Sequence, residues 1–386
     1  MTDLNKKGSV NENNKKNLYR IRMLFCRMLF VVVLISTFMA LSMCFIYGWH
    51  TTLELQEYNF LRSNGYVNLY SIGDYKLNMY RAGNTTSTHK IIGISGLGID
   101  DYGIGMSLVH DELKEDAQFI YIDRAGYGLS EDTKDIQTVD KIVSDYRNVL
   151  KEANINPPYI LMPHSIGGVY ATYWISLYPE EIEGVIYLDG TAIYENMSLD
   201  DVEKSTRWDE EFVELSQIGC SRLVYNRYMT YLSNDYSERL QDASEALQHH
   251  SIATFAKLSE SDEKNSNIIT TLENMHKTDI PKVYVSSFAG FRTKEEVKEY
   301  FEWPYNKAVS VEYTETRAEK LLAQVQDMRE EQLFPYVESL GNTELVYLPG
   351  DHLIYLQKPV ELANIIREFL CNLDNNVTID LDNAVG

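Results

Sequence analysis

Short apolar runs alternate with longer amphipathic stretches along most of the chain, from about Gly65 to Leu370. The runs are only four to seven residues long, which is typical of buried strands and too short for buried helices. Strands that alternate with helices form a mostly parallel sheet, which the helices cover on both faces. The predicted strands are Tyr66–Ile72, Lys76–Arg81, Lys90–Ser95, Phe119–Asp123, Tyr159–Met162, Val185–Leu188, Lys282–Ser287 and Glu344–Leu348.

The helices between these runs divide the chain into a core and two helical insertions. Lys141–Ala153, Gly167–Tyr178 and Val360–Leu370 have apolar residues at helical spacing and are predicted to be core helices. Residues 192–278 read as helical and are predicted to form a lid over the site, and about Lys294–Ser339 is a second helical stretch. The predicted domains are a core of residues 66–191 and 279–371, the lid of 192–278 and a C-terminal tail of 372–386.

Met28–Tyr47 is an uncharged run of twenty residues. As a helix it spans about 30 Å, which is the thickness of a hydrocarbon core. The apolar core of a cleaved signal peptide is shorter and is followed by small residues, which are missing here. The basic residues precede the run, which favours a cytoplasmic N-terminus. We therefore predict a single-pass protein of the cell membrane with its catalytic domain outside.

The segments on either side of this membrane helix differ in composition. Residues 1–27 carry a net charge of +5 and form a basic cytoplasmic tail, whose first 17 residues are polar and predicted to lack regular structure. Residues 48–65 are predicted to be a juxtamembrane linker or helix. The whole chain has a net charge of −22, which argues against nucleic acid as a partner.

Four cysteines give little evidence of a metal or redox site, because no C-x-x-C motif occurs. Cys220 and Cys371 lie far apart in the sequence, and whether they pair is left open. The pair His249-His250 has no further ligands nearby in the sequence and is better explained as surface residues. No metal or cofactor is predicted.

Ser165 follows the apolar run Tyr159–Met162 and precedes an amphipathic helix. A serine on a sharp turn between a strand and a helix has its hydroxyl lifted clear of the backbone. The N–H of Ile166 would then face a developing oxyanion. Serine also caps helices, so the strand–turn–helix context and the neighbouring glycines Gly167 and Gly168 carry the prediction of a nucleophile.

Over roughly residues 66–370 the chain resembles the α/β-hydrolase fold family, the serine hydrolases. The resemblance rests on motifs in the family's order: the Ser165 turn, with Pro163 in place of the usual glycine, and a loop at Ser95–Gly98 with Ser95 in place of the usual histidine. Two further matches are the turn Asp123–Ser130, to which we assign no chemistry, and the loop Leu348–His352. The resemblance implies that Leu97 and Ile166 supply the oxyanion-binding N–H groups.

The general base is predicted to be His352, because it follows Ser165 in the sequence, lies at a strand-end loop and precedes the last helix. The acid is less clear. The family often places it after the seventh strand, where this chain has no carboxylate. Asp189, at the end of the sixth strand, is the favoured candidate, and Glu295 and Asp327 are the alternatives.

These residues predict a membrane-anchored serine hydrolase that cleaves an ester, thioester, lactone or amide of a small molecule or peptide through an acyl-enzyme. A peptidase similar to proline iminopeptidases is an alternative, and it needs a carboxylate to bind a free amine. A hydrolase fold without catalysis, used for binding, is the alternative from another class. Three departures from the family pattern favour the non-catalytic alternative: Pro163, Ser95 and the displacement of the acid from the end of the seventh strand.

Overall fold

The computed structural model describes residues 3–194, 209–224, 232–304, 306 and 312–375. Its centre is an eight-stranded sheet in the order β1-β2-β4-β3-β5-β6-β7-β8. The two edge strands β1 and β2 run antiparallel, and the other six are parallel to one another. The predicted mostly parallel sheet is confirmed. The strands are β1 Leu69–Ser71, β2 Lys76–Gly83, β3 Lys90–Ile94, β4 Gln118–Ile122, β5 Tyr159–Pro163, β6 Ile182–Leu188, β7 Thr278–Ser286 and β8 Gly341–Tyr347.

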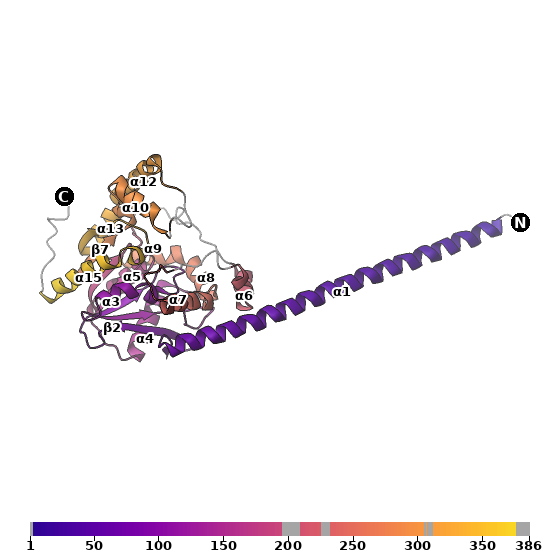
Figure 1. Cartoon of the computed structure of the whole chain (residues 1–386), viewed down its shortest axis with the longest axis horizontal. Helices are drawn as coiled ribbons and strands as arrows, with labels where there is room; N and C mark the ends of the chain where they lie inside the picture. The colour runs from indigo at the N-terminus through magenta and orange to yellow at the C-terminus, as the bar shows by residue number, and fades with distance from the viewer. Residues whose placement is uncertain (1–2, 195–208, 225–231, 305, 307–311, 376–386) are drawn as a thin grey trace.

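Helices cover both faces of this sheet (Figure 1). One face packs against α4, α5, α9 and α13, and the other packs against α2, α3, α14 and α15. The bounds of these helices are α2 Tyr102–Gly105, α3 Ser107–Glu112, α4 Val139–Glu152, α5 Gly167–Leu177, α9 Lys264–Asn274, α13 Phe334–Leu340, α14 Ile354–Gln357 and α15 Pro359–Asp374.

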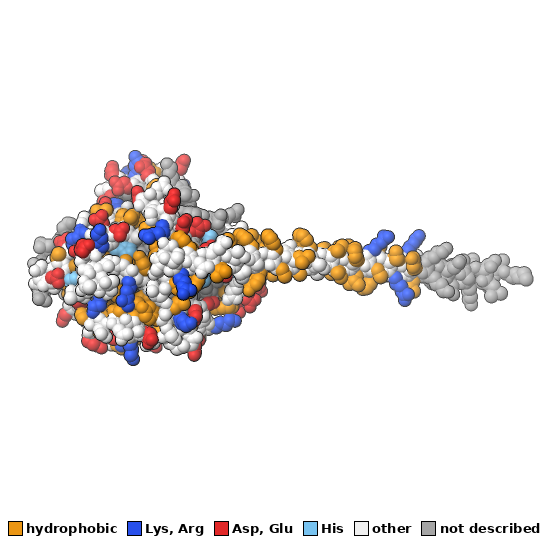
Figure 2. All heavy atoms as spheres, turned by 60° about the horizontal axis from the view of Figure 1, so that its bottom comes forward, with side chains coloured by type: hydrophobic (Ala, Val, Ile, Leu, Met, Phe, Trp, Pro, Cys, Tyr) orange, Lys and Arg blue, Asp and Glu red, His pale blue; other side chains and the backbone are white. Residues whose placement is uncertain are grey.

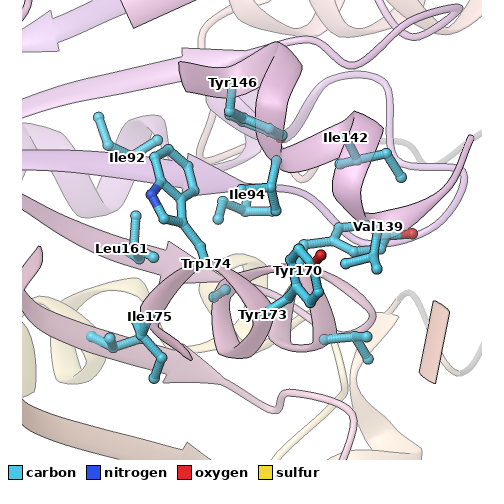
Figure 3. Close-up of a cluster of buried hydrophobic side chains, with 14 of the residues drawn as sticks. Ile92, Ile94, Val139, Ile142, Tyr146, Leu161, Tyr170, Tyr173, Trp174 and Ile175 are labelled. Atoms are coloured by element: carbon cyan, nitrogen blue, oxygen red, sulfur yellow. The ribbon is translucent and has the colours of Figure 1, made fainter. Parts of the chain in front are cut away.

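The helix that follows the predicted nucleophile is buried on nearly all sides. Ten of the eleven residues of α5 are buried, as expected for a helix that is apolar all round. Its Trp174 ring lies 6.1 Å from the Tyr146 ring of α4, and both pack over Ile92, Ile94 and Leu161 of the sheet (Figure 3). This packing holds the carboxyl ends of β3 and β5 in place beneath the site.

One helix, α1 Asp3–Ser63, runs through the tail, the apolar segment and the juxtamembrane residues. Its stretch Asn17–Ser63 is long and apolar enough to cross a membrane. The helix projects from the domain, with apolar side chains around it and basic side chains toward its free end (Figures 1 and 2). The expectation of an irregular tail over residues 1–17 is wrong for residues 3–17, and residues 1–2 lie outside the described residues. No proline interrupts the sequence of α1, so backbone hydrogen bonding continues through its polar end.

The end of α1 packs onto the domain. Leu61 is fully buried in a cluster with Ala243 and Leu247 of α7 Glu238–His250. The Glu57 carboxylate accepts two hydrogen bonds from the Arg222 guanidinium, at 2.7 and 2.6 Å. The apolar stretch of α1 therefore continues directly into a helical end that is docked on the domain.

The predicted lid contains α6 Glu210–Gln217, η2 Cys220–Leu223, α7, α8 Phe255–Asp262 and α9. Its last helix, α9, packs on α4 and α5 and so belongs to the layer beside the sheet. The lid residues 195–208 and 225–231 and the tail residues 376–386 lie outside the described residues.

A second helical insertion separates β7 from α13. It comprises η4 Phe288–Gly290, α10 Lys294–Glu302, α12 Glu315–Met328 and a π-helical turn, η5 Arg329–Leu333. Its own small core joins Phe291, Val297, Ala318 and Val325, all fully buried.

Cys220 and Cys371 are both free thiols.

Candidate active site

Ser165 lies on the short turn between β5 and α5. Its φ of 55° is in the left-handed region, which non-glycine residues seldom adopt. The turn brings the start of α5 so close to β3 that a Cβ on Gly167 would lie 2.5 Å from the Ile94 carbonyl oxygen. Only glycine fits there, so Gly167 permits the sharp turn that raises Ser165 above the ends of the strands.

Pro163, at the position where the family has glycine, is the last residue of β5 and pairs with Ile94. The N–H that reaches the Ile94 carbonyl comes from His164, at 2.9 Å. The missing N–H of proline therefore leaves this bond intact, and the strand end accepts the substitution.

His352 and Asp189 are joined by a short hydrogen bond, 2.6 Å from His352 Nδ1 to Asp189 Oδ2. His352 follows β8 on a loop and its imidazole is about half exposed, whereas Asp189 follows β6 and its side chain is 12 % exposed. The other oxygen of the carboxylate, Oδ1, accepts the Ser287 N–H at 3.0 Å. Both oxygens of Asp189 are thus engaged, and the carboxylate is fixed in direction.

The pKa values of this pair shift in the directions that suit a base and its charged partner. Burial alone would lower the pKa of His352, but the hydrogen bond and charge of Asp189 raise it above its ordinary value. Burial alone would raise the pKa of Asp189, but the bonds from His352 and Ser287 hold it below its ordinary value. Asp189 is therefore an anion at neutral pH.

The two alternative acids lie elsewhere. Glu295 is exposed in the first turn of α10, and Asp327 is exposed near the end of α12. Among the residues that the structure describes, the carboxylate bonded to His352 is that of Asp189. A carboxylate after the seventh strand is not needed, because β6 and β7 are neighbours in the sheet and their ends lie side by side.

The loop Ser95–Gly98 follows β3 and lies against Ser165. A Cβ on Gly96 would be 3.1 Å from the Ser165 Cβ. The buried Arg124 donates to the carbonyl oxygens of Ser95 and Gly96, at 2.8 and 3.0 Å. In a trans peptide the C=O and the following N–H point in opposite directions. Because the Gly96 carbonyl faces Arg124, the N–H of Leu97 points away from Arg124.

Arg124 is itself held by a buried network that reaches the lid. Its guanidinium lies 3.1 Å from Glu260 of α8, and both side chains are at most 3 % exposed. Tyr170 of α5 donates to Glu260 at 2.6 Å, and Tyr127 accepts the Gly98 N–H at 3.1 Å. The turn Asp123–Ser130, to which the sequence assigns no chemistry, therefore fixes the loop that carries Leu97.

Comparison with known proteins agrees with this architecture. The family model described as serine aminopeptidase, S33, matches residues 89–256. The epoxide hydrolase CorEH superposes with a TM-score of 0.55 at 17% identity, over 79% of this chain and 98% of that chain. The haloalkane dehalogenase DatA from Agrobacterium tumefaciens gives 0.51 at 14% identity, over 79% and 97%. The chain has the α/β-hydrolase fold.

A curated relative of this chain is the protein YbdG of Bacillus subtilis. It is 33% identical over 175 residues, which are 45% of this chain and 50% of the relative. The chain thus spans about half the length of that relative. The solved structures are less than a fifth identical and show the fold alone.

His164, beside Ser165, is a residue whose place the sequence does not predict. It is fully buried, and its Nε2 lies 2.9 Å from the backbone oxygen of His352. A carbonyl only accepts, so Nε2 carries the proton. Burial lowers the pKa of His164 to about 3, and the ring is neutral. His164 therefore ties the turn of Ser165 to the loop of His352.

A pocket of about 400 Å³ opens beside His352 and Asp189. The ends of β6 and β7, η4 and the π-helical turn η5 form its walls. The insertion after β7 thus borders the candidate site, although the sequence assigns the covering role to residues 192–278.

Proposed function

We propose that this α/β-hydrolase is a membrane-anchored serine hydrolase that cleaves an ester, thioester, lactone or amide through an acyl-enzyme. The observation that carries the proposal is the bond between His352 Nδ1 and Asp189. That bond leaves the lone pair of the imidazole on Nε2, the nitrogen that a general base uses.

Ser165 supplies the nucleophile. Its Oγ attacks the carbonyl carbon, and its proton passes to His352 Nε2. The carbonyl oxygen becomes an oxyanion that accepts hydrogen bonds from the N–H groups of Leu97 and Ile166. Each donor stabilises the transition state by about 3 kcal/mol. The imidazolium then protonates the leaving group as its bond to carbon breaks. Water, deprotonated by His352, releases the acid and restores Ser165.

The apolar helix supports the anchoring part of the proposal. The docked end of α1 follows its apolar stretch directly, so cleavage after Tyr47 would sever a helix that pairs Glu57 with Arg222. Retention of the helix holds the domain at the membrane surface.

A peptidase that binds a free amine is a second candidate, because the matching family model is that of serine aminopeptidases. Such an enzyme needs a carboxylate to pair with the amine. Among the described residues that line the pocket, the carboxylate is that of Asp189, and it is already bonded to His352. We therefore favour ester, thioester or lactone substrates.

The test is covalent labelling of the full-length chain, purified in detergent, with a fluorophosphonate. We expect labelling of the wild type and none of Ser165→Ala, because phosphonylation needs the activated hydroxyl. Ser144→Ala, an exposed serine of α4, is the matched control and should label normally. A correctly folded wild type that takes no label would overturn the proposal and favour a binding protein without catalysis.

A further inference from the structure

The pocket beside His352 has walls that are mainly apolar. Ala192, Phe288, Ala289, Met328 and Leu333 line it. Its volume of about 400 Å³ lies within the range of small-ligand sites. A group bound there would lose its hydration and gain contacts with carbon atoms, which favours an apolar group.

The wall of this pocket that η4 and η5 form is held in place by Arg329. Its guanidinium donates to the carbonyl oxygens of Ala289 and Phe291, at 3.1 and 2.9 Å. These bonds tie η5 to the loop that follows β7. A π-helical turn is rare and often lies at a functional site. Here it brings Met328, Gln332 and Leu333 to the same wall.

The polar groups of the lining are nearly all uncharged. Thr191, Ser286 and Gln332 are neutral, and Tyr284 stays neutral because burial raises the pKa of its phenol well above the ordinary value. The two remaining ionisable groups, Asp189 and His352, are bonded to each other. The Ser286 hydroxyl is buried without a hydrogen-bond partner. A charged substrate group would find no free counter-charge among the described lining residues, and its desolvation would be uncompensated.

The position of the pocket indicates which part of a substrate it takes. His352 lines it, whereas Leu97, Ile166 and Ser165 do not. In the tetrahedral intermediate the leaving group faces the imidazolium that protonates it, and the acyl group points elsewhere. A pocket on the histidine side therefore lies on the leaving-group side.

We infer that this pocket binds the leaving group, and that the preferred substrates are esters of an uncharged, apolar alcohol. The inference rests on the proposed serine-hydrolase function and adds the substrate class. Met328 and Leu333 would then determine specificity, since they come from the insertion and form no part of the acid–base machinery.

The experiment uses the full-length chain in detergent and two isomeric esters, hexyl acetate and methyl heptanoate. They contain the same atoms, but the long chain is on the alcohol in one and on the acid in the other. We expect the wild type to favour hexyl acetate in kcat/KM by at least about tenfold. The 6-aminohexyl ester of acetic acid, which carries a cation, should be cleaved at least about tenfold more slowly than hexyl acetate.

Two variants test the pocket itself. Met328→Trp fills it and should lower kcat/KM for hexyl acetate by about tenfold or more, with methyl acetate changed less than about twofold. Met328→Ala enlarges the pocket and should shift the preference in kcat/KM from hexyl acetate toward octyl acetate. This second variant tests the pocket even if Met328→Trp folds poorly. Ala323→Trp, exposed on the same helix, is the matched control and should match the wild type.

The outcomes separate this inference from the proposed function. The inference would be overturned if Met328→Trp lowered kcat/KM equally for hexyl acetate and methyl acetate, or lowered it more for methyl heptanoate. A wild-type preference for methyl heptanoate over hexyl acetate would also overturn it. In each case fluorophosphonate labelling of Ser165 would persist and keep the proposed function. No labelling of the wild type would overturn both.

Discussion

Three non-glycine residues have positive φ among the described residues, and two of them, Ser165 at 55° and Asp189 at 44°, lie in the candidate site. Such a backbone costs about 1–3 kcal/mol per residue and persists only where the surroundings fix it. The Ser165 carbonyl accepts the N–H groups of Gly168 and Thr191, both at 2.9 Å, and the Asp189 N–H donates to Val285 at 2.8 Å. At the residue scale, the strained backbone conformations at Ser165 and Asp189 therefore coincide with two residues of the proposed catalytic triad.

The acid is the residue whose replacement is most informative. Asp189→Asn should lower kcat by about 10³–10⁴-fold, because an amide can donate to Nδ1 and so stabilise the wrong tautomer of His352. Steady-state kinetics on a small ester measures this loss. Glu295→Gln, on the exposed face of α10, should leave kcat unchanged. A comparable loss in that variant would move the acid's role to Glu295.

The pH dependence follows from the same pair. A protonated His352 cannot accept the serine proton, so kcat/KM should rise with pH through the pKa of His352. Because Asp189 holds that pKa above the ordinary value of 6.5, the midpoint should lie above 6.5. Asp189→Asn should move the midpoint to lower pH. A wild-type midpoint below 6.5, measured as kcat/KM against pH, would contradict the shift.

Arg124 is predicted to act by positioning the Leu97 N–H. The double variant Arg124→Met, Glu260→Gln removes both buried charges together, so neither is left unpaired. We expect kcat to fall by about 10²-fold, as for the loss of one oxyanion donor, with KM changed little. The thermal unfolding midpoint of the double variant should be measured together with its kcat and KM. A large loss of stability with normal kcat would assign the pair a structural role only.

At the scale of elements, α1 combines a long apolar stretch with a docked end in one helix. Its apolar stretch is long enough for a membrane, and its last turns bury Leu61 and pair Glu57 with Arg222 of η2. The insertion after β7 is the other element with a defined task, because Arg329 fixes it against the site. The insertion after β7 thus borders the site itself, whereas α1 docks on α7 and η2.

The docking of α1 should contribute to stability. Glu57→Gln removes the charge partner of Arg222, whose side chain is 3 % exposed, and should destabilise the domain by about 2–3 kcal/mol. Thermal unfolding of the full-length chain in detergent measures the effect as a lower midpoint. The exposed pair Lys76–Glu131, with both side chains about half exposed, is the control. Glu131→Gln should change stability by less than about 0.5 kcal/mol.

At the scale of the whole molecule, charge is divided between the two ends of α1. The first 27 residues carry +5 and the whole chain −22, so the domain is strongly acidic. Basic residues ahead of a membrane helix favour a cytoplasmic N-terminus, which would place the acidic domain outside.

This orientation can be tested with a protease added to intact cells. We expect digestion of the domain and protection of an epitope tag at the N-terminus. Cells made permeable beforehand serve as the control and should lose both. A domain that survives the protease on intact cells, but not on permeable cells, would place it inside.

The sequence by itself determined the strands of the sheet and the position of the turn that carries Ser165. All eight predicted strands overlap strands of the sheet, because burial periodicity is a local property of the chain. The length of α1 was underestimated, since its polar end carries no periodic signal.

Tertiary structure decided the rest of the site. Asp189 and His352 are 163 residues apart, and only the side-by-side order of β6, β7 and β8 brings them together. The roles of Arg124 and His164 depend on carbonyl groups of distant loops, and the pocket depends on an insertion folding back over β6 and β7. Contacts between distant segments leave no periodic pattern in the sequence, because packing geometry and not local propensity creates them.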